Sequence, residues 1–137
     1  MKILIMGLPG SGKTTLATNL TNVLGSDCVW INADTIRKLY NDWDFSLEGR
    51  LRQAIRMKKL ADNSCSKYII CDFVAPLTQM RDIFNADYTI WMDTISKSRF
   101  EDTDNLFEKP AFCDLIIRDK NAKKWAKLIA HILSENH

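Results

Sequence analysis

The chain has few of the features that mark secreted, membrane-spanning or zinc-binding proteins. Its four cysteines, Cys28, Cys65, Cys71 and Cys113, form no CxxC pair, and only two histidines accompany them. No apolar run approaches the roughly 18 residues that cross a bilayer, and the apolar start at 3–6 is too short for a signal peptide. These absences exclude a CxxC metal motif and predict a cytoplasmic protein with no membrane partner and no structural zinc site.

The chain also lacks a strong charge of either sign, internal repeats and a linker rich in Pro, Gly or Ser. Its 19 basic and 17 acidic residues leave a net charge of +2, too small to predict a nucleic-acid partner. At 137 residues the chain is expected to form one domain over 1–137.

What is present is an alternation of short apolar runs with longer amphipathic ones. The pattern predicts strands at 2–6, 28–31, 68–74, 88–92 and 115–117, and helices at 13–24, 34–40, 46–62, 77–84 and 122–133. Residues 94–112 are predicted to be irregular. The alternation predicts an α/β fold of three layers, with a roughly five-stranded parallel sheet flanked by helices. In such sheets ligands bind beyond the carboxyl ends of the strands, which directs attention to 7–15, 32–37, 72–81 and 93–110.

The first of these segments reads GLPGSGKTT and fits G-x-x-x-x-G-K-[ST] directly after a buried strand. Its glycines allow successive backbone N–H groups to converge on phosphate oxygens, Lys13 would reach the outer phosphates, and the Thr14 hydroxyl would bind Mg²⁺. A glycine turn that only joins a strand to a helix is the weaker alternative. The motif therefore predicts binding of ATP with Mg²⁺ through Gly7, Leu8, Pro9, Gly10, Ser11, Gly12, Lys13, Thr14 and Thr15.

A phosphate loop alone does not separate kinases from GTPases and motor ATPases. The chain has no Asn-Lys-x-Asp tetrad to recognise guanine, and it is too short for the additional elements of a motor. A compact kinase is therefore the favoured class.

Residues after the second predicted strand carry the charges expected of an acceptor site. Asp34 would either cap the following helix or stand opposite the phosphate loop, where it could accept a proton from a substrate hydroxyl or order the magnesium shell. Arg37 places a cation near the start of this helix, where it opposes the helix dipole, so it is predicted to face an anionic ligand.

Two further features are read in two ways. Arg50, Gln53 and Arg56 form one stripe of a predicted helix that would hold a substrate phosphate or sulfate, whereas a solvated face accounts for Arg52, Lys58 and Lys59. Asp72 ends an apolar strand, as in the pattern that orders magnesium in P-loop proteins; a structural hydrogen bond is the alternative.

The order of these motifs resembles that of the adenylylsulfate kinase family, which phosphorylates the 3′-hydroxyl of adenosine 5′-phosphosulfate (APS). That family reads roughly G-L-S-G-S-G-K-[ST]-T, D-G-D-x-[LIV]-R, G-F-S-x-x-D-R-x-x-N-I-R-R and I-S-P-x-x-x-x-R, and this chain reads GLPGSGKTT, NADTIR, DFSLEGRLRQAIR and VAPLTQMR. The segment FEDTDNLFEKP at 100–110 is similar to the family's F-T-G-x-D-x-P-Y-E-x-P.

The resemblance implies a P-loop kinase fold, use of ATP and a small-molecule acceptor, APS or similar. It implies that Asp34 is the catalytic carboxylate. Lys13 of the phosphate loop and Arg99 are the other catalytic candidates, and Thr14 of the loop and Asp72 are the candidate metal ligands, Asp72 independently of the resemblance. The residues that would contact or surround the acceptor are Asp34, Arg37, Phe45, Arg50, Gln53, Val74 and Pro76. Phe45 would stack on a purine or serve as a core aromatic.

The chain departs from the family pattern at several positions. Asn32 replaces the first Asp of D-G-D, Gln53 replaces Asn, and Gly49 replaces an acid. Most of the basic lid is missing between 93 and 100, which leaves Arg99 as the candidate for neutralising the transferred phosphoryl group. Another nucleotide or a sugar-like alcohol as acceptor, and a non-catalytic nucleotide-binding module, therefore stay open, as does a homodimer.

Overall fold

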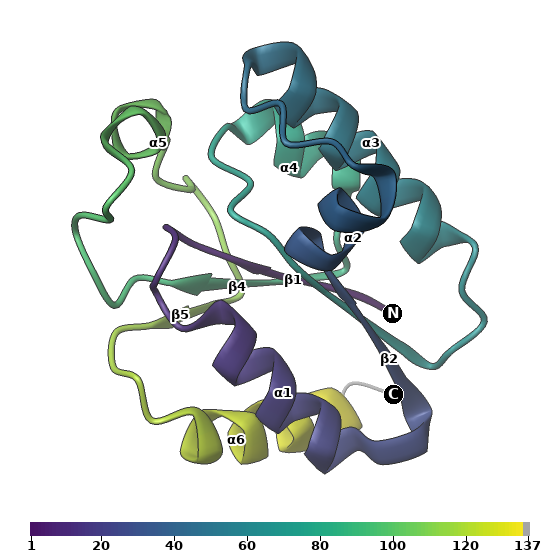
Figure 1. Cartoon of the computed structure of the whole chain (residues 1–137). Coiled ribbons are helices and arrows are strands. Elements are labelled where there is room, and N and C mark those ends of the chain that lie inside the picture. Colours follow the sequence, from purple (N-terminus) through teal and green to yellow (C-terminus); the bar gives the residue numbers. More distant parts are fainter. Residues whose placement is uncertain (136–137) are drawn as a thin grey trace.

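The computed structural model of the chain describes residues 1–135 and contains a five-stranded sheet in the order β2-β3-β1-β4-β5. Every neighbouring pair of strands is parallel (Figure 1). The strands are β1 (Lys2–Met6), β2 (Cys28–Asn32), β3 (Tyr68–Asp72), β4 (Tyr88–Met92) and β5 (Leu115–Ile117). The predicted α/β fold with five parallel strands is confirmed.

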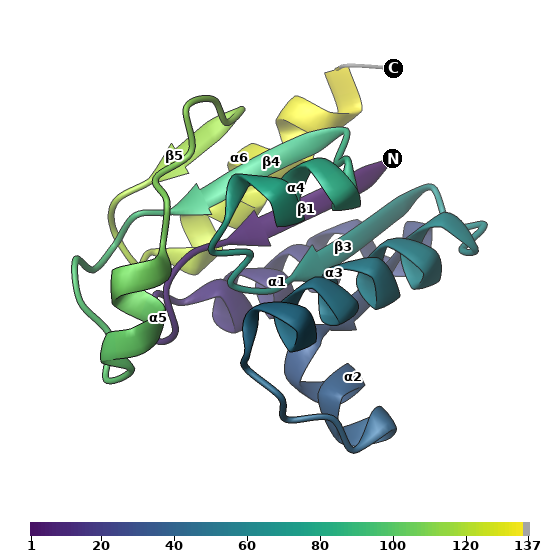
Figure 2. The ribbon, with the colours of Figure 1, turned by 90° about the horizontal axis from the view of Figure 1, so that it is seen from above.

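Helices cover both faces of this sheet and produce three layers. They are α1 (Lys13–Leu24), α2 (Ala33–Tyr40), α3 (Leu47–Asp62), α4 (Thr78–Phe84), α5 (Glu101–Leu106) and α6 (Ala122–Glu135). Figures 1 and 2 show α1 and α6 on one face and α2, α3 and α4 on the other. Parallel strands buried on both faces need such cover, because neither face can be left to water.

The two cores follow from the alternation of side chains along β1. Ile3 and Ile5 pack with residues of α1 and α6 such as Leu16 and Ile129. Leu4 and Met6 point to the opposite face and pack with residues of α3 and α4. Because successive side chains of a strand point to opposite faces, the apolar run of β1 contributes to both cores.

The strand predicted at 68–74 ends at Asp72, and one α-helix was not predicted. Residues 94–112 were expected to be irregular, but 101–106 form α5. This helix of six residues is too short for an apolar period, and contacts from outside it hold it in place. Ser98 donates from its backbone N–H and from its hydroxyl to the Asp104 carboxylate, and Arg50 donates to the Thr103 hydroxyl.

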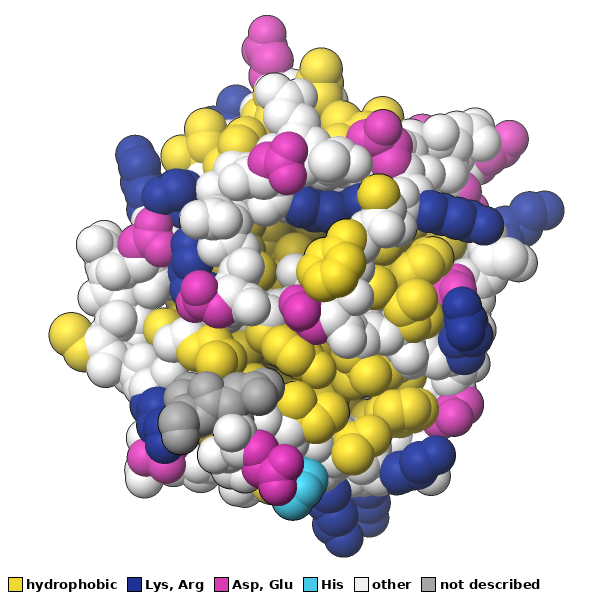
Figure 3. All heavy atoms as spheres, turned by 180° about the vertical axis from the view of Figure 1, so that it is seen from behind, with side chains coloured by type: hydrophobic (Ala, Val, Ile, Leu, Met, Phe, Trp, Pro, Cys, Tyr) yellow, Lys and Arg dark blue, Asp and Glu magenta, His cyan; other side chains and the backbone are white. Residues whose placement is uncertain are grey.

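No helix within residues 1–135 combines the length and the apolarity that a bilayer span requires. The face opposite to that of Figure 1 carries a patch of hydrophobic side chains, with basic and acidic side chains around it (Figure 3).

The start of α3 depends on a close approach of the chain before it. The Ser46 hydroxyl caps α3 by accepting from the Gly49 N–H at 3.2 Å. The preceding segment folds back so tightly that a Cβ on Gly49 would overlap the carbonyl oxygen of Asp44 and lie 2.6 Å from its Cγ. The acid that the family carries at this position therefore does not fit here.

We expect Gly49→Ala to lower the free energy of unfolding by about 1–3 kcal/mol, because the added methyl group forces the Asp44 backbone away from α3. Chemical denaturation followed by circular dichroism measures this, with Lys59→Ala on the exposed side of α3 as the control. Equal stability of Gly49→Ala and the control would contradict the packing described.

Candidate active site

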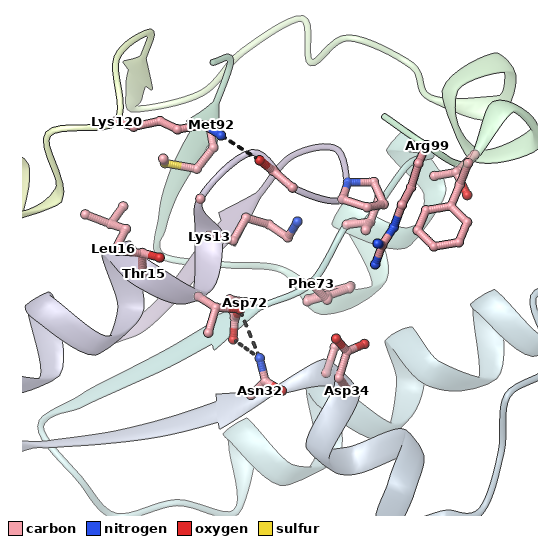
Figure 4. Close-up of a pocket in the computed structure, with 18 of the residues that line it drawn as sticks. Lys13, Thr15, Leu16, Asn32, Asp34, Asp72, Phe73, Met92, Arg99 and Lys120 are labelled. Atoms are coloured by element: carbon pink, nitrogen blue, oxygen red, sulfur yellow. Dashed lines mark hydrogen bonds between the residues drawn. The ribbon is translucent and has the colours of Figure 1, made fainter. Parts of the chain in front are cut away.

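A cavity of about 890 Å³ opens at the carboxyl ends of the strands (Figure 4). One wall is the phosphate loop with the start of α1, and the opposite wall is formed by α2, the segment before α3, and the start of α3. Its volume lies in the range typical of small-molecule sites. The position agrees with the rule that parallel sheets bind ligands at this edge.

The phosphate loop takes the backbone conformation that its glycines allow. Gly10 and Gly12 have φ of 82° and 101°, where a side chain would be strained. Pro9, Gly10, Gly12, Lys13, Thr14 and Thr15 line the cavity, as predicted for the nucleotide side. Gly7, Leu8 and Ser11 lie behind this surface: Leu8 and Ser11 are buried, and a Cβ on Gly7 would lie 2.8 Å from the Met92 carbonyl oxygen.

Lys13 is the cation of this wall. Its Nζ donates to the Leu8 carbonyl oxygen at 3.0 Å, and its side chain is 9% exposed. Burial lowers the pKa of Lys13 to about 8, against the opposing effect of Asp72 and Asp34. Above about pH 8 the neutral amine of Lys13 therefore takes up a proton when negative charge enters the cavity.

A second lysine supports the loop and was not predicted. Lys120, between β5 and α6, donates from Nζ to the Gly10 carbonyl oxygen at 2.9 Å and lines the cavity together with Asp119 and Trp125. Its sequence position does indicate such a role, because Lys120 closely follows the strand predicted at 115–117 and therefore lies at the carboxyl end of a strand.

Thr14 and Asp72 meet where the phosphate loop passes the end of β3. The Thr14 hydroxyl donates to Asp72 Oδ2 at 3.1 Å, and both residues line the cavity. Burial raises the pKa of the Asp72 carboxyl group, while hydrogen bonds from Trp30, Asn32 and Thr14 act in the opposite direction. The predicted proximity of Thr14 and Asp72 is thus present in the structure.

This pair fits a magnesium ion that is shared with a nucleotide. A hydroxyl and a carboxylate are hard oxygen donors, and Mg²⁺ is usually held by one or two such groups together with phosphates and water. Within residues 1–135 no group of three or more His, Cys, Asp or Glu side chains could hold a metal ion alone. Any magnesium here would depend on the phosphates for the rest of its coordination.

Asn32, not Asp34, caps α2. Asn32 Oδ1 accepts from the Thr35 N–H at 3.0 Å, so the alternative that made Asp34 the cap is wrong. Asp34 is the second residue of the helix, and its exposed carboxylate points into the cavity below the phosphate loop (Figure 4). Its charge acts on Lys13 across the cavity.

Arg37 lies beyond the first turn of α2, so the argument from the helix dipole does not apply to it. Its side chain is buried and does not line the cavity. Its Nη1 donates to the carbonyl oxygens of Asp42 and Asp44 at 3.0 and 3.2 Å, and its guanidinium lies 4.3 Å from the ring centroid of Phe45. In this structure Arg37 supports the segment before α3 from behind.

The predicted stripe of Arg50, Gln53 and Arg56 also has protein partners. Gln53 Nε2 donates to the Ala33 carbonyl oxygen at 3.0 Å, and Arg56 donates to Gln53 Oε1 and to Asp42. Of the three, only Arg50 lines the cavity. The stripe as a continuous anion-binding surface is therefore not what the structure contains.

Arg50 and Phe45 both line the wall of the cavity that faces the phosphate loop. Arg50 Nε donates to the Phe45 carbonyl oxygen at 2.8 Å and Nη2 to the Thr103 hydroxyl at 2.9 Å. Phe45 is 49% exposed and lines the cavity, so it is not a core aromatic. Val74 lines the cavity too, whereas Pro76 lies outside it and accepts from the Glu108 N–H at 2.7 Å.

Arg99 reaches the cavity from the segment before α5. Its side chain is exposed and points between Lys13 and Asp34 (Figure 4). Phe100 stacks beside it, with 5.2 Å from the guanidinium carbon to the ring centroid. Four aromatic residues that line the cavity were not predicted: Trp43, Phe73, Phe100 and Trp125. The first three lie next to or near a predicted residue in sequence.

Comparisons with known proteins agree with this arrangement. The family described as adenylylsulphate kinase matches residues 1–94. A probable adenylyl-sulfate kinase of Aeropyrum pernix is 37% identical over 87 residues, which cover 58% of this chain and about half (46%) of that relative.

Solved structures show a similar fold at low identity. The Mycobacterium tuberculosis APS kinase CysC in complex with AMPPNP and APS superposes with a TM-score of 0.79 at 19% identity, covering 97% of this chain and 96% of that one. The shikimate kinase of Aquifex aeolicus gives a TM-score of 0.71 at 16% identity, covering 99% and 98%. The fold is therefore one shared by kinases with different acceptors.

We expect the affinity for ATP to fall as the pH rises through about 8. A bound triphosphate favours protonated Lys13, so the pKa of Lys13 is higher in the complex and binding takes up a proton above the pKa of the free protein. The affinity should fall by up to about tenfold per pH unit there. Calorimetric titration between pH 7 and 9.5, in buffers of different ionisation enthalpy, counts the proton. Lys13→Met should bind more weakly without this uptake; an unchanged pH profile in that variant would exclude Lys13 as the titrating group.

Proposed function

The chain belongs to the adenylylsulphate kinase family, and on this basis we propose that it transfers the γ-phosphoryl group of ATP to a hydroxyl of an APS-like acceptor. One observation carries the proposal: a single cavity is lined by the phosphate loop and, on the facing wall, by Asp34, Phe45 and Arg50. These three residues are called the acceptor wall below. A carboxylate and a guanidinium group thus face the loop that would bind the triphosphate, which supports the proposal.

The nucleotide side would bind ATP through the N–H groups of the phosphate loop and the Lys13 ammonium group. Thr14 and Asp72 would hold the magnesium ion, which when bound neutralises charge on the phosphate oxygens. Lys120 would keep the loop in place through its bond to Gly10.

The chemistry would follow from Asp34 and the two cations that face it. The Asp34 carboxylate accepts the proton of the acceptor hydroxyl. At the same time the hydroxyl oxygen of the acceptor forms a bond to the γ-phosphorus, and the bond between the γ-phosphorus and the β,γ-bridging oxygen breaks. ADP and the phosphorylated acceptor are the products. Lys13 and Arg99 stabilise the negative charge of the transferred group from two sides.

The acceptor would lie against Phe45, which offers an exposed aromatic face, and beside Arg50, which offers a cation for a phosphate or sulfate. Arg37 and Gln53 would act indirectly. Arg37 stacks behind Phe45 and Gln53 holds the start of α2, so both fix the acceptor wall.

A different alcohol acceptor is favoured by one observation. The family match ends at residue 94, whereas Arg99, Phe100 and α5, which cover the acceptor side, follow it. Arg50 is the one cation that α3 contributes to the cavity, and several aromatic rings line it as well. The wall would therefore also suit a nucleoside or a sugar-like alcohol, which carries less charge than APS.

A coupled assay of ADP release tests the kinase proposal and separates the acceptors. Purified protein with ATP and Mg²⁺ is offered APS, nucleosides and sugar alcohols in parallel. We expect APS to give the highest kcat/KM. A higher value for an uncharged alcohol would favour the second acceptor class, and absence of any acceptor-dependent turnover would leave a non-catalytic nucleotide-binding module.

We expect Asp34→Asn to lower kcat by about 10²–10⁴-fold, since the amide cannot accept the proton. ATP affinity should stay within about twofold, because the variant keeps the shape of the wall. Glu101→Gln removes an exposed carboxylate of α5 that does not line the cavity and serves as the control. Full turnover by Asp34→Asn would exclude this residue as the base.

A further inference from the structure

The Asp72 carboxylate is the most fully hydrogen-bonded acid of the site. It is 2% exposed, and its two oxygens accept from three side chains that belong to two elements, α1 and β2. Trp30 Nε1 donates to Oδ1 at 2.7 Å, Asn32 Nδ2 lies 3.1 Å from both oxygens, and Thr14 Oγ1 donates to Oδ2 at 3.1 Å. A carboxylate buried so deeply is stable as an anion only when its oxygens have such donors.

We propose that Trp30 and Asn32 are positioning residues that aim the Asp72 carboxylate at Thr14 and thereby set the affinity of the site for Mg²⁺ with a nucleotide. This inference rests on the proposed nucleotide site. The Trp30 indole and the Asn32 amide, which it assigns to the support of that site, are not part of the family motifs given above.

The register of the sheet produces this geometry. Asn32 and Asp72 are aligned partners of the β2–β3 ladder, so their side chains lie on the same face. Trp30 is two residues before Asn32 and shares that face. Both donors therefore approach Asp72 from β2, and Thr14 approaches it from α1.

Asn32 is itself fixed, which makes it a rigid support. Its Oδ1 accepts from the backbone N–H of Thr35 at 3.0 Å and from the Thr35 hydroxyl at 3.1 Å. These bonds orient the amide so that its NH₂ group faces Asp72 and spans both oxygens (Figure 4). An Asp at position 32 would instead place a second carboxylate against Asp72.

Trp30 is not part of the cavity that Thr14, Asn32 and Asp72 line. Its indole lines a second hollow of about 380 Å³, to which Thr14 and Asn32 also contribute. Because Trp30 does not line the main cavity and donates to Asp72, we expect its effect on metal binding to pass through the Asp72 carboxylate. Loss of such an outer partner typically weakens metal binding by 10–100-fold.

The test compares binding of N-methylanthraniloyl-ATP with and without Mg²⁺ in two variants. Trp30→Phe keeps an aromatic ring and removes the N–H donor, and Asn32→Ser keeps a good helix cap and removes the amide donor. In each we expect the Mg²⁺-dependent gain in affinity to fall about tenfold, with metal-free affinity within about twofold of the parent protein.

Trp91→Phe is the matched control, because Trp91 is also a tryptophan of a strand but is buried in the core on the other face of the sheet. Retention of the full Mg²⁺ effect in a folded Trp30→Phe protein overturns the inference, as does an equal loss with and without Mg²⁺. If Trp30→Phe does not fold, Asn32→Ser decides in the same way. The measurement needs no acceptor, so failure of the kinase assay does not affect it.

Discussion

The hydrogen bond from the Thr14 hydroxyl to the Asp72 carboxylate is the contact on which the nucleotide side of the site depends. It joins the first turn of α1 to the last residue of β3, and it can form only because β3 lies beside β1 in the sheet. The same order places β2 next to β3, which brings Asn32 and Asp34 to this edge. One topological feature thus assembles residues from three separate parts of the sequence.

The acceptor wall depends on packing as much as on charge. Phe45 is held between the guanidinium groups of Arg37 and Arg50, at 4.3 and 5.5 Å from its ring centroid. Asp42 pairs with Arg52 and Arg56, and Gly49 lets the chain pass close to α3. Many of the charges that look like a binding surface in the sequence therefore serve to fix one exposed aromatic ring and one arginine in the cavity.

The strands, the phosphate loop and Asp72 could be predicted because their signals are local. A buried strand is a short apolar run, and the phosphate loop needs glycines and a lysine at fixed spacing. Asp34 was singled out because it follows a predicted strand, and Arg50 because it lies on a basic stripe of a predicted helix, whereas Phe45 came from the family resemblance. The proposed roles of all these residues are still predictions.

The remaining features depend on contacts between distant residues, which a single sequence does not reveal. Helix α5 is fixed by Arg50, 53 residues away from Thr103, and Lys120 reaches Gly10 across 110 residues. Arg37 and Gln53 were assigned to the ligand because nothing in the sequence shows that backbone carbonyl groups accept from them. Charged residues near a site are easily taken for ligand contacts when their structural partners are unknown.

The proposed function requires that one cavity hold the triphosphate and the acceptor on facing walls. A crystal structure of the protein with Mg²⁺, a non-hydrolysable ATP analogue and APS tests it most directly. The account predicts the γ-phosphate beside Lys13 and Thr14, and an acceptor hydroxyl within hydrogen-bonding distance of the Asp34 carboxylate. A nucleotide bound in the loop with APS absent from the acceptor wall, or bound away from Asp34, would contradict it.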